Sequence, residues 1–212
     1  MDHKQRTIAF INSLDKGNSP FLYELEKYAK ETDVPIIRKH TESLLRFLLA
    51  EHQPKRILEV GTAIGYSALI MHAACPEAHI TTIEKYEKRI PLARENFKKA
   101  NAEDAITLIE GDAMEVLQSL EGTYDFIFMD AAKGQYIHFL PEIMRLLPKG
   151  GLLVSDNVLQ DGDLIESRYA VTRRDRTIHA RMREYLYTLT HSEELQTVIL
   201  SDGDGVSLSV KR

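Results

Sequence analysis

The apolar positions in the first fifty residues recur at helical spacing. They predict an opening helix that ends near Leu14, a second helix that begins at Pro20, and a third over residues 39–52. Proline favours the first turn of a helix, where its missing N–H group costs nothing. Pro35 interrupts the connector between the second and third helices. The third helix has an apolar face for packing, formed by Leu44, Leu45, Leu48 and Leu49.

After Pro54 the pattern alternates between short β-type runs and longer helical runs. Strand-then-helix units follow one another, and parallel neighbours need such long, right-handed crossovers. This predicts a doubly wound α/β fold, a Rossmann-like sheet that is mostly parallel and has helices on both faces. The expected strands are residues 56–60, 78–84, 105–110, 124–130 and 151–156, and the expected helices are residues 65–75, 86–101, 112–120 and 134–147.

The last forty or so residues depart from this alternation. An arginine-rich helical pattern covers about residues 172–191 and is followed by two β-type runs. These runs flank Asp202-Gly203-Asp204-Gly205, which predicts a hairpin and therefore an antiparallel last strand. We expect a seven-stranded sheet in one domain, residues 1–212, with a helical cap in residues 1–53 and the α/β core in residues 54–212.

The composition narrows the classes of protein that fit this pattern. The 212 residues carry 27 Lys and Arg against 32 Asp and Glu, and the net charge of −5 argues mildly against bulk binding of nucleic acid. Cys75 is the single cysteine, so disulfides within the chain and clustered thiolate metal sites are excluded. The charged start lacks the apolar core of a signal peptide, and no run approaches the roughly 18–20 apolar residues of a membrane span. We expect a cytoplasmic protein with no membrane contact.

One local cluster of charge runs against the acidic average. Residues 168–183 hold six arginines and one acid, Asp175. Such an excess is typical of a phosphate-binding surface, of a solvated helix face or of a contact between subunits. The cluster consists of Arg168, Arg173, Arg174, Arg176, Arg181 and Arg183.

A glycine-containing turn follows the first expected strand. Gly61 and Gly65 flank this turn directly before a helix, where backbone N–H groups are free to contact a ligand. Glu84 ends the next strand, 23 residues after Gly61, where an acid hydrogen-bonds a ribose diol in nucleotide-binding folds. Asp112 and Ala113 follow the third strand in the same way. Two roles are open for Asp112, contact with an adenine edge and capping of a helix.

The acid before the glycine turn separates two classes of cofactor. Glu59 would repel the diphosphate of a nicotinamide dinucleotide, whereas the sulfonium and ammonium groups of S-adenosylmethionine favour a negative neighbour. The expected antiparallel last strand is also typical of the methyltransferase sheet. A methyltransferase is therefore favoured over a dehydrogenase.

The most informative chemistry lies at the ends of the fourth and fifth strands. Asp130, Asp156 and Asn157 converge there, because parallel strands present their carboxyl ends at one sheet edge. Two carboxylates and an amide oxygen form a hard ligand set that suits Mg²⁺ or another divalent cation such as Mn²⁺. The alternative is that these acids only cap helices, but three oxygen ligands together with Lys133 favour a metal site. Lys133 follows Asp130 by three residues, and a partly desolvated lysine beside a cation gives up its proton more readily, as a general base must.

These motifs together resemble the class I, cation-dependent O-methyltransferases of the catechol and caffeoyl-CoA type over nearly the whole chain. The matching segments are Glu59-Val-Gly61-Thr-Ala-Ile-Gly65-Tyr66-Ser67, Thr82-Ile-Glu84, Gly111-Asp112-Ala113, Asp130-Ala-Ala-Lys133-Gly-Gln-Tyr136 and Asp156-Asn157-Val158. The resemblance implies a homodimer, a cation held by Asp130, Asp156 and Asn157, and catalysis by Asp130 and Lys133, with Lys133 taking the substrate proton. It also implies an S-adenosylmethionine site formed by Ile36, Glu59, Gly61, Gly65, Tyr66, Ser67, Glu84, Asp112, Ala113 and Asp130.

The substrate is the point on which the sequence leaves alternatives open. The short chain, the cap and residues 156–162 most resemble bacterial tRNA 5-hydroxyuridine methyltransferases, which make 5-methoxyuridine at the wobble position. No aromatic pair that would clamp a catechol ring follows the metal residues. In this interpretation Arg173 and Arg174 hold the anticodon backbone, and Tyr136 or Tyr169 stacks on a base. The alternatives are a small catechol or phenol, a non-catalytic RNA-binding or cofactor-sensing protein, and a nicotinamide oxidoreductase.

Overall fold

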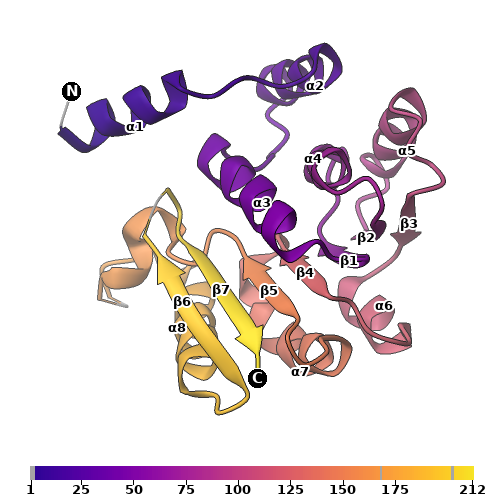
Figure 1. Cartoon of the computed structure of the whole chain (residues 1–212). Coiled ribbons are helices and arrows are strands. Elements are labelled where there is room, and N and C mark those ends of the chain that lie inside the picture. Colours follow the sequence, from indigo (N-terminus) through magenta and orange to yellow (C-terminus); the bar gives the residue numbers. More distant parts are fainter. Residues whose placement is uncertain (1–2, 168, 202) are drawn as a thin grey trace.

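Three helices precede the sheet, as the sequence predicts. The computed structural model describes residues 3–167, 169–201 and 203–212. Helices α2 and α3 pack against the first helix of the core, α4, while α1 extends away from the sheet (Figure 1). Leu45 and Leu49 are fully buried on the apolar face of α3. The bounds are His3–Ser13 for α1, Pro20–Glu31 for α2, Lys39–His52 for α3 and Tyr66–Ala74 for α4.

Seven strands form one sheet in the order β3-β2-β1-β4-β5-β7-β6. Neighbours among β1 to β5 are parallel, whereas β7 is antiparallel to both β5 and β6. The predicted mostly parallel sheet with an antiparallel last strand is therefore confirmed. The strands are β1 (Arg56–Val60), β2 (His79–Glu84), β3 (Ile106–Glu110), β4 (Phe126–Met129), β5 (Leu152–Ser155), β6 (Leu195–Leu200) and β7 (Val206–Lys211).

Helices cover both faces of the sheet, and the strand sequences explain why. Successive side chains of a strand point to opposite faces, so Ile57 joins the apolar core under α2 to α5 and Leu58 joins the core under α6 to α8. Both faces are buried, which requires the nearly continuous apolar runs seen in β1, β4 and β5. The remaining helices are α5 (Ile90–Lys99), α6 (Ala113–Ser119), α7 (Tyr136–Leu146) and α8 (Arg176–His191).

The structure differs from the prediction mainly in the segment before α8. This helix begins at Arg176 rather than near Thr172. The hydroxyl of Thr172 donates a hydrogen bond of 2.5 Å to the carboxylate of Asp175, which closes a separate turn before the helix. Two short 3₁₀ helices, η1 (Lys133–Gln135) and η2 (Gln160–Ile165), were not expected from the sequence. Within the described part of the chain, no helix is long and apolar enough to cross a membrane.

Candidate cofactor and metal site

A cavity of about 530 Å³ lies at the edge where the parallel strands end. Residues that end or closely follow all five of these strands line it, namely Gly61, Glu84, Gly111, Asp130 and Asn157. This is the crevice in which open α/β sheets bind their ligands. The predicted cofactor residues that line it are Ile36, Gly61, Tyr66, Ser67, Glu84, Asp112, Ala113 and Asp130.

Gly61 is required because two segments of backbone approach closely. Its φ is 109°, and a Cβ there would overlap the backbone carbonyl of Asp130. Gly65 differs from its prediction, since it does not line the cavity. It precedes α4 with a φ of 83°, and a Cβ there would overlap the ring of Phe97. The structure therefore gives Gly65 a role in packing between α4 and α5, and its contact with the cofactor stays a prediction.

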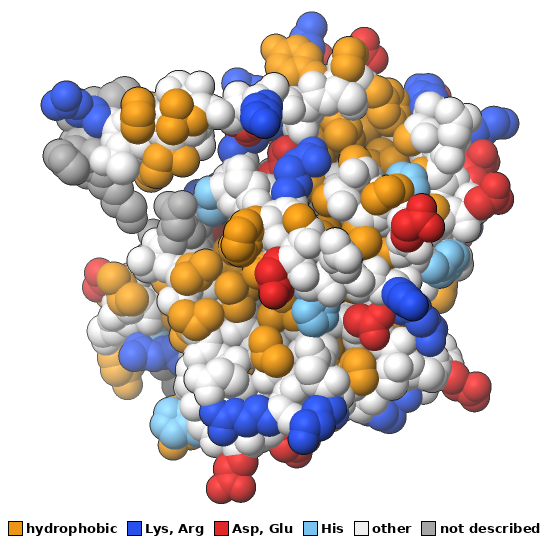
Figure 2. Space-filling model, viewed as in Figure 1, with side chains coloured by type: hydrophobic (Ala, Val, Ile, Leu, Met, Phe, Trp, Pro, Cys, Tyr) orange, Lys and Arg blue, Asp and Glu red, His pale blue; other side chains and the backbone are white. Residues whose placement is uncertain are grey.

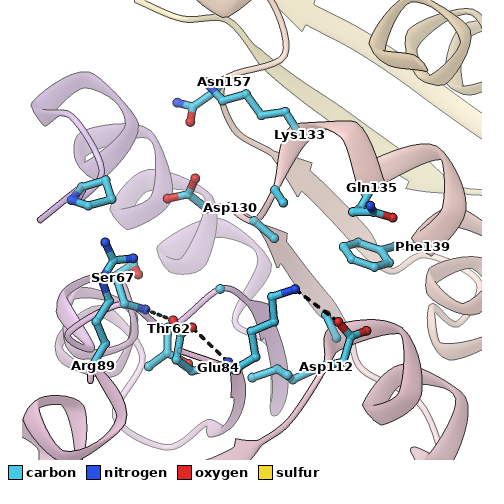
Figure 3. A pocket seen from close by; sticks show the side chains of 18 of the residues that line it. Thr62, Ser67, Glu84, Arg89, Asp112, Asp130, Lys133, Gln135, Phe139 and Asn157 are labelled. Carbon is cyan, nitrogen blue, oxygen red and sulfur yellow. Dashed lines mark hydrogen bonds and ion pairs between the residues drawn. The ribbon is translucent and has the colours of Figure 1, made fainter. Parts of the chain in front are cut away.

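Glu84 is held rigidly at the cavity wall. Its carboxylate accepts hydrogen bonds from the backbone N–H groups of Ala63, Lys85 and Tyr86, at 2.8, 2.9 and 2.8 Å. A carboxylate has about four acceptor positions, so capacity remains for a ribose hydroxyl. The fixed orientation fits the predicted contact with a ribose diol (Figure 3).

Asp112 serves as a helix cap and also lines the cavity. Its Oδ1 accepts from the backbone N–H of Met114 at 2.9 Å, which caps α6, and its Oδ2 lies 3.3 Å from Nζ of Lys85. The bond from Met114 and then the Lys85 contacts lower the pKa of Asp112. The capping role left open by the sequence is confirmed.

Glu59 lies behind the cavity rather than in its wall. It is completely buried, and the hydroxyl of Thr82 donates to its Oε2 at 2.5 Å. Burial raises the pKa of Glu59 to about 8, while bonds from Ser67 and Thr82 lower it. Its Oε1 has no hydrogen-bond partner among the described residues. A buried acceptor of this kind suits a cationic ligand group. Ser67, which interacts with Glu59, lines the cavity.

Two of the predicted metal ligands, Asp130 and Asn157, line the cavity, and Figure 3 shows both away from Asp112. Asp156 directly precedes Asn157, is 1% exposed and is close enough for its charge to act on Asp130. The Asp156 carboxylate accepts from the hydroxyl of Thr41 at 3.2 Å and from the backbone N–H of Asn157 at 2.9 Å. Both bonds end on Oδ1 of Asp156, so they fix the orientation of this carboxylate.

The electrostatics of this cluster fit a bound cation. Removal from water, and then the charge of Asp156, raise the pKa of Asp130 to about 7, although Lys133 opposes this shift. Burial likewise raises the pKa of Asp156. The two neighbouring carboxylates therefore have too little positive charge near them to stabilise their ionised forms fully. No group of three His, Cys, Asp or Glu side chains suited to a metal occurs in the described ranges, so the predicted set depends on the amide of Asn157.

Lys133 stands at the same end of the cavity. It opens η1 directly after β4, and Figure 3 shows its side chain directed toward Asn157 above Asp130. The short 3₁₀ turn, rather than a regular helix start, aims the lysine inward. The arrangement places an amine beside two carboxylates and the cofactor cavity, as acid–base chemistry requires.

Comparison with known proteins decides the class. A family described as O-methyltransferase matches residues 12–212. The chain belongs to the O-methyltransferase family. It is 28% identical over 209 residues to the catechol O-methyltransferase of Mycobacterium tuberculosis, across 96% of this chain and 94% of that protein. It is 32% identical over 176 residues to caffeoyl-CoA O-methyltransferase 2 of Populus trichocarpa, across 77% of this chain and 70% of that protein.

A solved structure supports the same assignment. A SAH-bound methyltransferase of Podospora anserina matches this O-methyltransferase with a TM-score of 0.88 and 28% identity, over 100% of this chain and 97% of that one. The O-methyltransferase family and the fold expected from the sequence are therefore confirmed. Membership of this family excludes the alternative that the chain is a nicotinamide oxidoreductase.

Tyr136 does not have the substrate role predicted for it. Its ring is fully buried and meets Tyr185 edge to face, with centroids 5.5 Å apart. Its hydroxyl donates to the carbonyls of Met129 and Asp156, at 3.1 and 3.2 Å, and accepts from Ala131 at 3.3 Å. A ring enclosed in this way cannot stack on a base. Tyr136 instead supports the strand ends that carry the site.

The arginine cluster lies beside the cavity rather than in it. Arg173 and Arg174 are exposed and do not line the cavity, so their predicted contact with substrate depends on a ligand that extends beyond it. The guanidinium of Arg181 donates a hydrogen bond of 3.1 Å to the carbonyl of Gly134, the residue after Lys133. Arg168 lies outside the described residues.

Several residues of the site were missed by the sequence analysis. Thr41 reaches the site from α3, and Lys85, Arg89 and Phe139 line the cavity. Lys85 directly follows Glu84, so the strand end could have drawn attention to it. No local pattern marks Thr41, because the contact depends on how α3 packs against the end of β5.

Proposed function

We propose that this O-methyltransferase transfers the methyl group of S-adenosylmethionine to the 5-hydroxyl of 5-hydroxyuridine at the tRNA wobble position, with Mg²⁺ or Mn²⁺ bound. The observation that carries the proposal is the set of Asp130, Asp156 and Asn157 beside the cofactor cavity, with Lys133 on the same wall. An ordinary nucleotide pocket has no need for this cluster.

Different residues of the cavity would bind different parts of the cofactor. Glu84 would accept the ribose hydroxyls, and the segment of Asp112 and Ala113 would contact the adenine edge. Ser67, with Glu59 behind it, would receive the methionine end. This order leaves the sulfonium methyl near Asp130, at the metal end of the cavity.

The substrate chemistry follows from this placement. In 5-hydroxyuridine the 5-hydroxyl and the 4-carbonyl are vicinal oxygens, as in a catechol. A bound divalent cation would lower the pKa of the hydroxyl and align both oxygens. Lys133 would take the hydroxyl proton. The oxygen would then attack the methyl group in line with the S–CH₃ bond, from roughly 3 Å, and S-adenosylhomocysteine would leave as that bond breaks. Asp130 would be both a cation ligand and part of the wall of the cofactor cavity.

An exposed segment beside the cavity supports an RNA substrate. Tyr169 is 82% exposed, and the guanidinium of Arg176 lies 5.6 Å from the centre of its ring. Arg173 and Arg174 extend the positive charge. A solvated aromatic ring among cations suits the stacking of an unpaired base and contact with phosphates. A tRNA substrate also agrees with the cytoplasmic location expected from the sequence.

A small phenol is the second candidate substrate. The relatives named above are a catechol and a caffeoyl-CoA O-methyltransferase, and a catechol presents the same pair of vicinal oxygens. Turnover of free catechol at a rate equal to that with tRNA would favour this alternative.

Apolar side chains on the surface support a homodimer. Figure 2 shows them on α1 and over α3 and the β6–β7 pair. These large apolar side chains are 41–66% exposed, and exposed apolar surface of this kind is typical of sites that contact another protein. We expect sedimentation equilibrium to give twice the chain mass. The residues are Phe10, Ile11, Leu14, Phe47, Val198 and Val210.

One experiment separates these substrates. The protein is incubated with labelled S-adenosylmethionine, Mg²⁺ and tRNA that carries 5-hydroxyuridine, and the nucleosides are analysed by mass spectrometry. We expect 5-methoxyuridine, and none with EDTA in excess. Methyl transfer that survives complete chelation would refute the metal role. Transfer to catechol without transfer to tRNA would refute the RNA substrate.

A further inference from the structure

The turn between β6 and β7 contacts the segment that follows β5. The N–H groups of Val158 and Leu159 donate to the carbonyl oxygens of Gly205 and Asp204, at 3.0 and 2.7 Å. Val158 directly follows Asn157. Two consecutive backbone bonds therefore fix the proposed metal-binding segment to the hairpin.

Glycine permits this close approach on both sides of the turn. A Cβ on Gly205, whose φ is 80°, would overlap the side chain of Leu159. A Cβ on Gly203, whose φ is 56°, would overlap the imidazole of His40 in α3. The turn is thus packed between α3 and the metal-binding segment.

An ion pair joins the same turn to the start of α3. Nη1 of Arg38 lies 2.6 Å from Oδ1 of Asp204, which is 7% exposed. Arg38 precedes the first residue of α3 and follows residues 35–37, which line the cofactor cavity. Three residues after Arg38, Thr41 bonds to Asp156.

From these contacts we infer that Arg38 and Asp204 are positioning residues for cation binding. Their ion pair holds the hairpin turn against α3. The backbone carbonyls of this turn then hold the Asp156–Leu159 segment in place. The inference rests on the proposed metal-dependent function. Neither Arg38 nor Asp204 lines the cofactor cavity.

A purely electrostatic role would give a different result for one partner. The negative charge of Asp204 is felt at Asp130, whose pKa it raises. Removing that charge should weaken cation binding by charge alone, whereas removing the positive charge of Arg38 should strengthen it. Positioning predicts weaker binding in both cases, so the variant Arg38→Met separates the two explanations.

The test is a titration of the complete protein with Mn²⁺ at saturating S-adenosylhomocysteine, with free Mn²⁺ measured by electron paramagnetic resonance. We expect the Mn²⁺ dissociation constant to rise about tenfold in both Arg38→Met and Asp204→Asn, as for other partners of metal ligands. The double variant should bind no worse than either single variant, because the pair is broken only once. Arg38→Lys should retain most of the affinity.

The matched control is Glu26→Gln. It breaks an ion pair of 3.1 Å with Lys39, one residue from Arg38, that does not involve the hairpin. We expect its Mn²⁺ affinity to stay within about twofold of the wild type. The Arg38 side chain is half exposed, and Met keeps its aliphatic stem, so Arg38→Met should fold. This variant therefore tests the inference even if Asp204→Asn does not fold.

The outcomes are distinct. Wild-type or tighter Mn²⁺ binding by Arg38→Met overturns the positioning role and leaves the metal-dependent function intact. Failure of the wild-type protein to bind Mn²⁺ refutes the proposed metal site, and this inference with it.

Discussion

The hydroxyl of Thr41 lies 3.2 Å from Oδ1 of Asp156, across 115 positions of sequence. Both residues are buried, so the bond sets the orientation of the carboxylate. We expect Thr41→Val to raise the Mg²⁺ concentration for half-maximal activity about tenfold. The measurement is an Mg²⁺ titration at saturating cofactor. Thr41→Ser keeps the hydroxyl and should behave as the wild type, and an unchanged Mg²⁺ requirement in Thr41→Val would contradict the role.

Lys133 is the expected general base. Replacement by Met should lower kcat by about 10²–10⁴-fold, the usual contribution of a positioned base. Binding of S-adenosylhomocysteine, measured by calorimetry, should change by less than about twofold because Lys133 is assigned to the substrate. Lys149 is exposed and outside the cavity, and Lys149→Met is the control. Full activity in Lys133→Met would eliminate the proposed base.

Glu84 should dominate recognition of the ribose. Hydrogen bonds to a charged group contribute about 1.5–3 kcal/mol, so Glu84→Ala should weaken binding of S-adenosylhomocysteine about 10- to 100-fold. Glu87→Ala, an exposed acid on the same loop, should have no effect. Equal affinities of the two variants would remove Glu84 from the cofactor site.

Tyr136 should matter for stability and not for substrate binding. Tyr136→Phe removes the hydroxyl that accepts from the N–H of Ala131 and donates to the carbonyl of Met129, and the free energy of unfolding should fall by about 1–3 kcal/mol. Urea denaturation measures this, with exposed Tyr169→Phe as the control. A large rise in substrate KM with unchanged stability would restore the substrate role.

Glu59 should make the stability of the ligand-free protein depend on pH. Its pKa rises from 4.5 to about 8 on folding, mainly through burial. The folded state therefore favours the protonated acid, so this contribution is complete below about pH 4.5 and is lost as the pH rises through about 8. Thermal unfolding followed from pH 5 to pH 9 should show this decline.

Glu59→Gln supplies the comparison for that decline. Without an ionisable group at this position, the melting temperature of the variant should fall less over the same range. The change in the free energy of unfolding that depends on Glu59 should be on the order of a few kcal/mol at most over this range. Parallel curves for the variant and the wild type would assign the pH dependence to other groups.

The sequence predicts the sheet and most of the site because the decisive signals are local. Apolar runs in β1, β4 and β5 mark strands, and parallel strands bring their ends together, so Asp130 and Asn157 could be placed side by side. Tyr136 was misassigned, although the helical spacing of Tyr136, Leu140 and Ile143 puts it on an apolar face. Thr41 could not be found, since only tertiary packing brings it to the site.

The position of β7 has a consequence for how the molecule is made. This strand lies between β5 and β6 and forms hydrogen bonds with both. During synthesis, β6 therefore cannot join the sheet until the residues of β7 have left the ribosome. A nascent chain that ends before Val206 also lacks the carbonyls that anchor Val158 and Leu159. The enzyme should therefore become competent only once translation has passed its final strand.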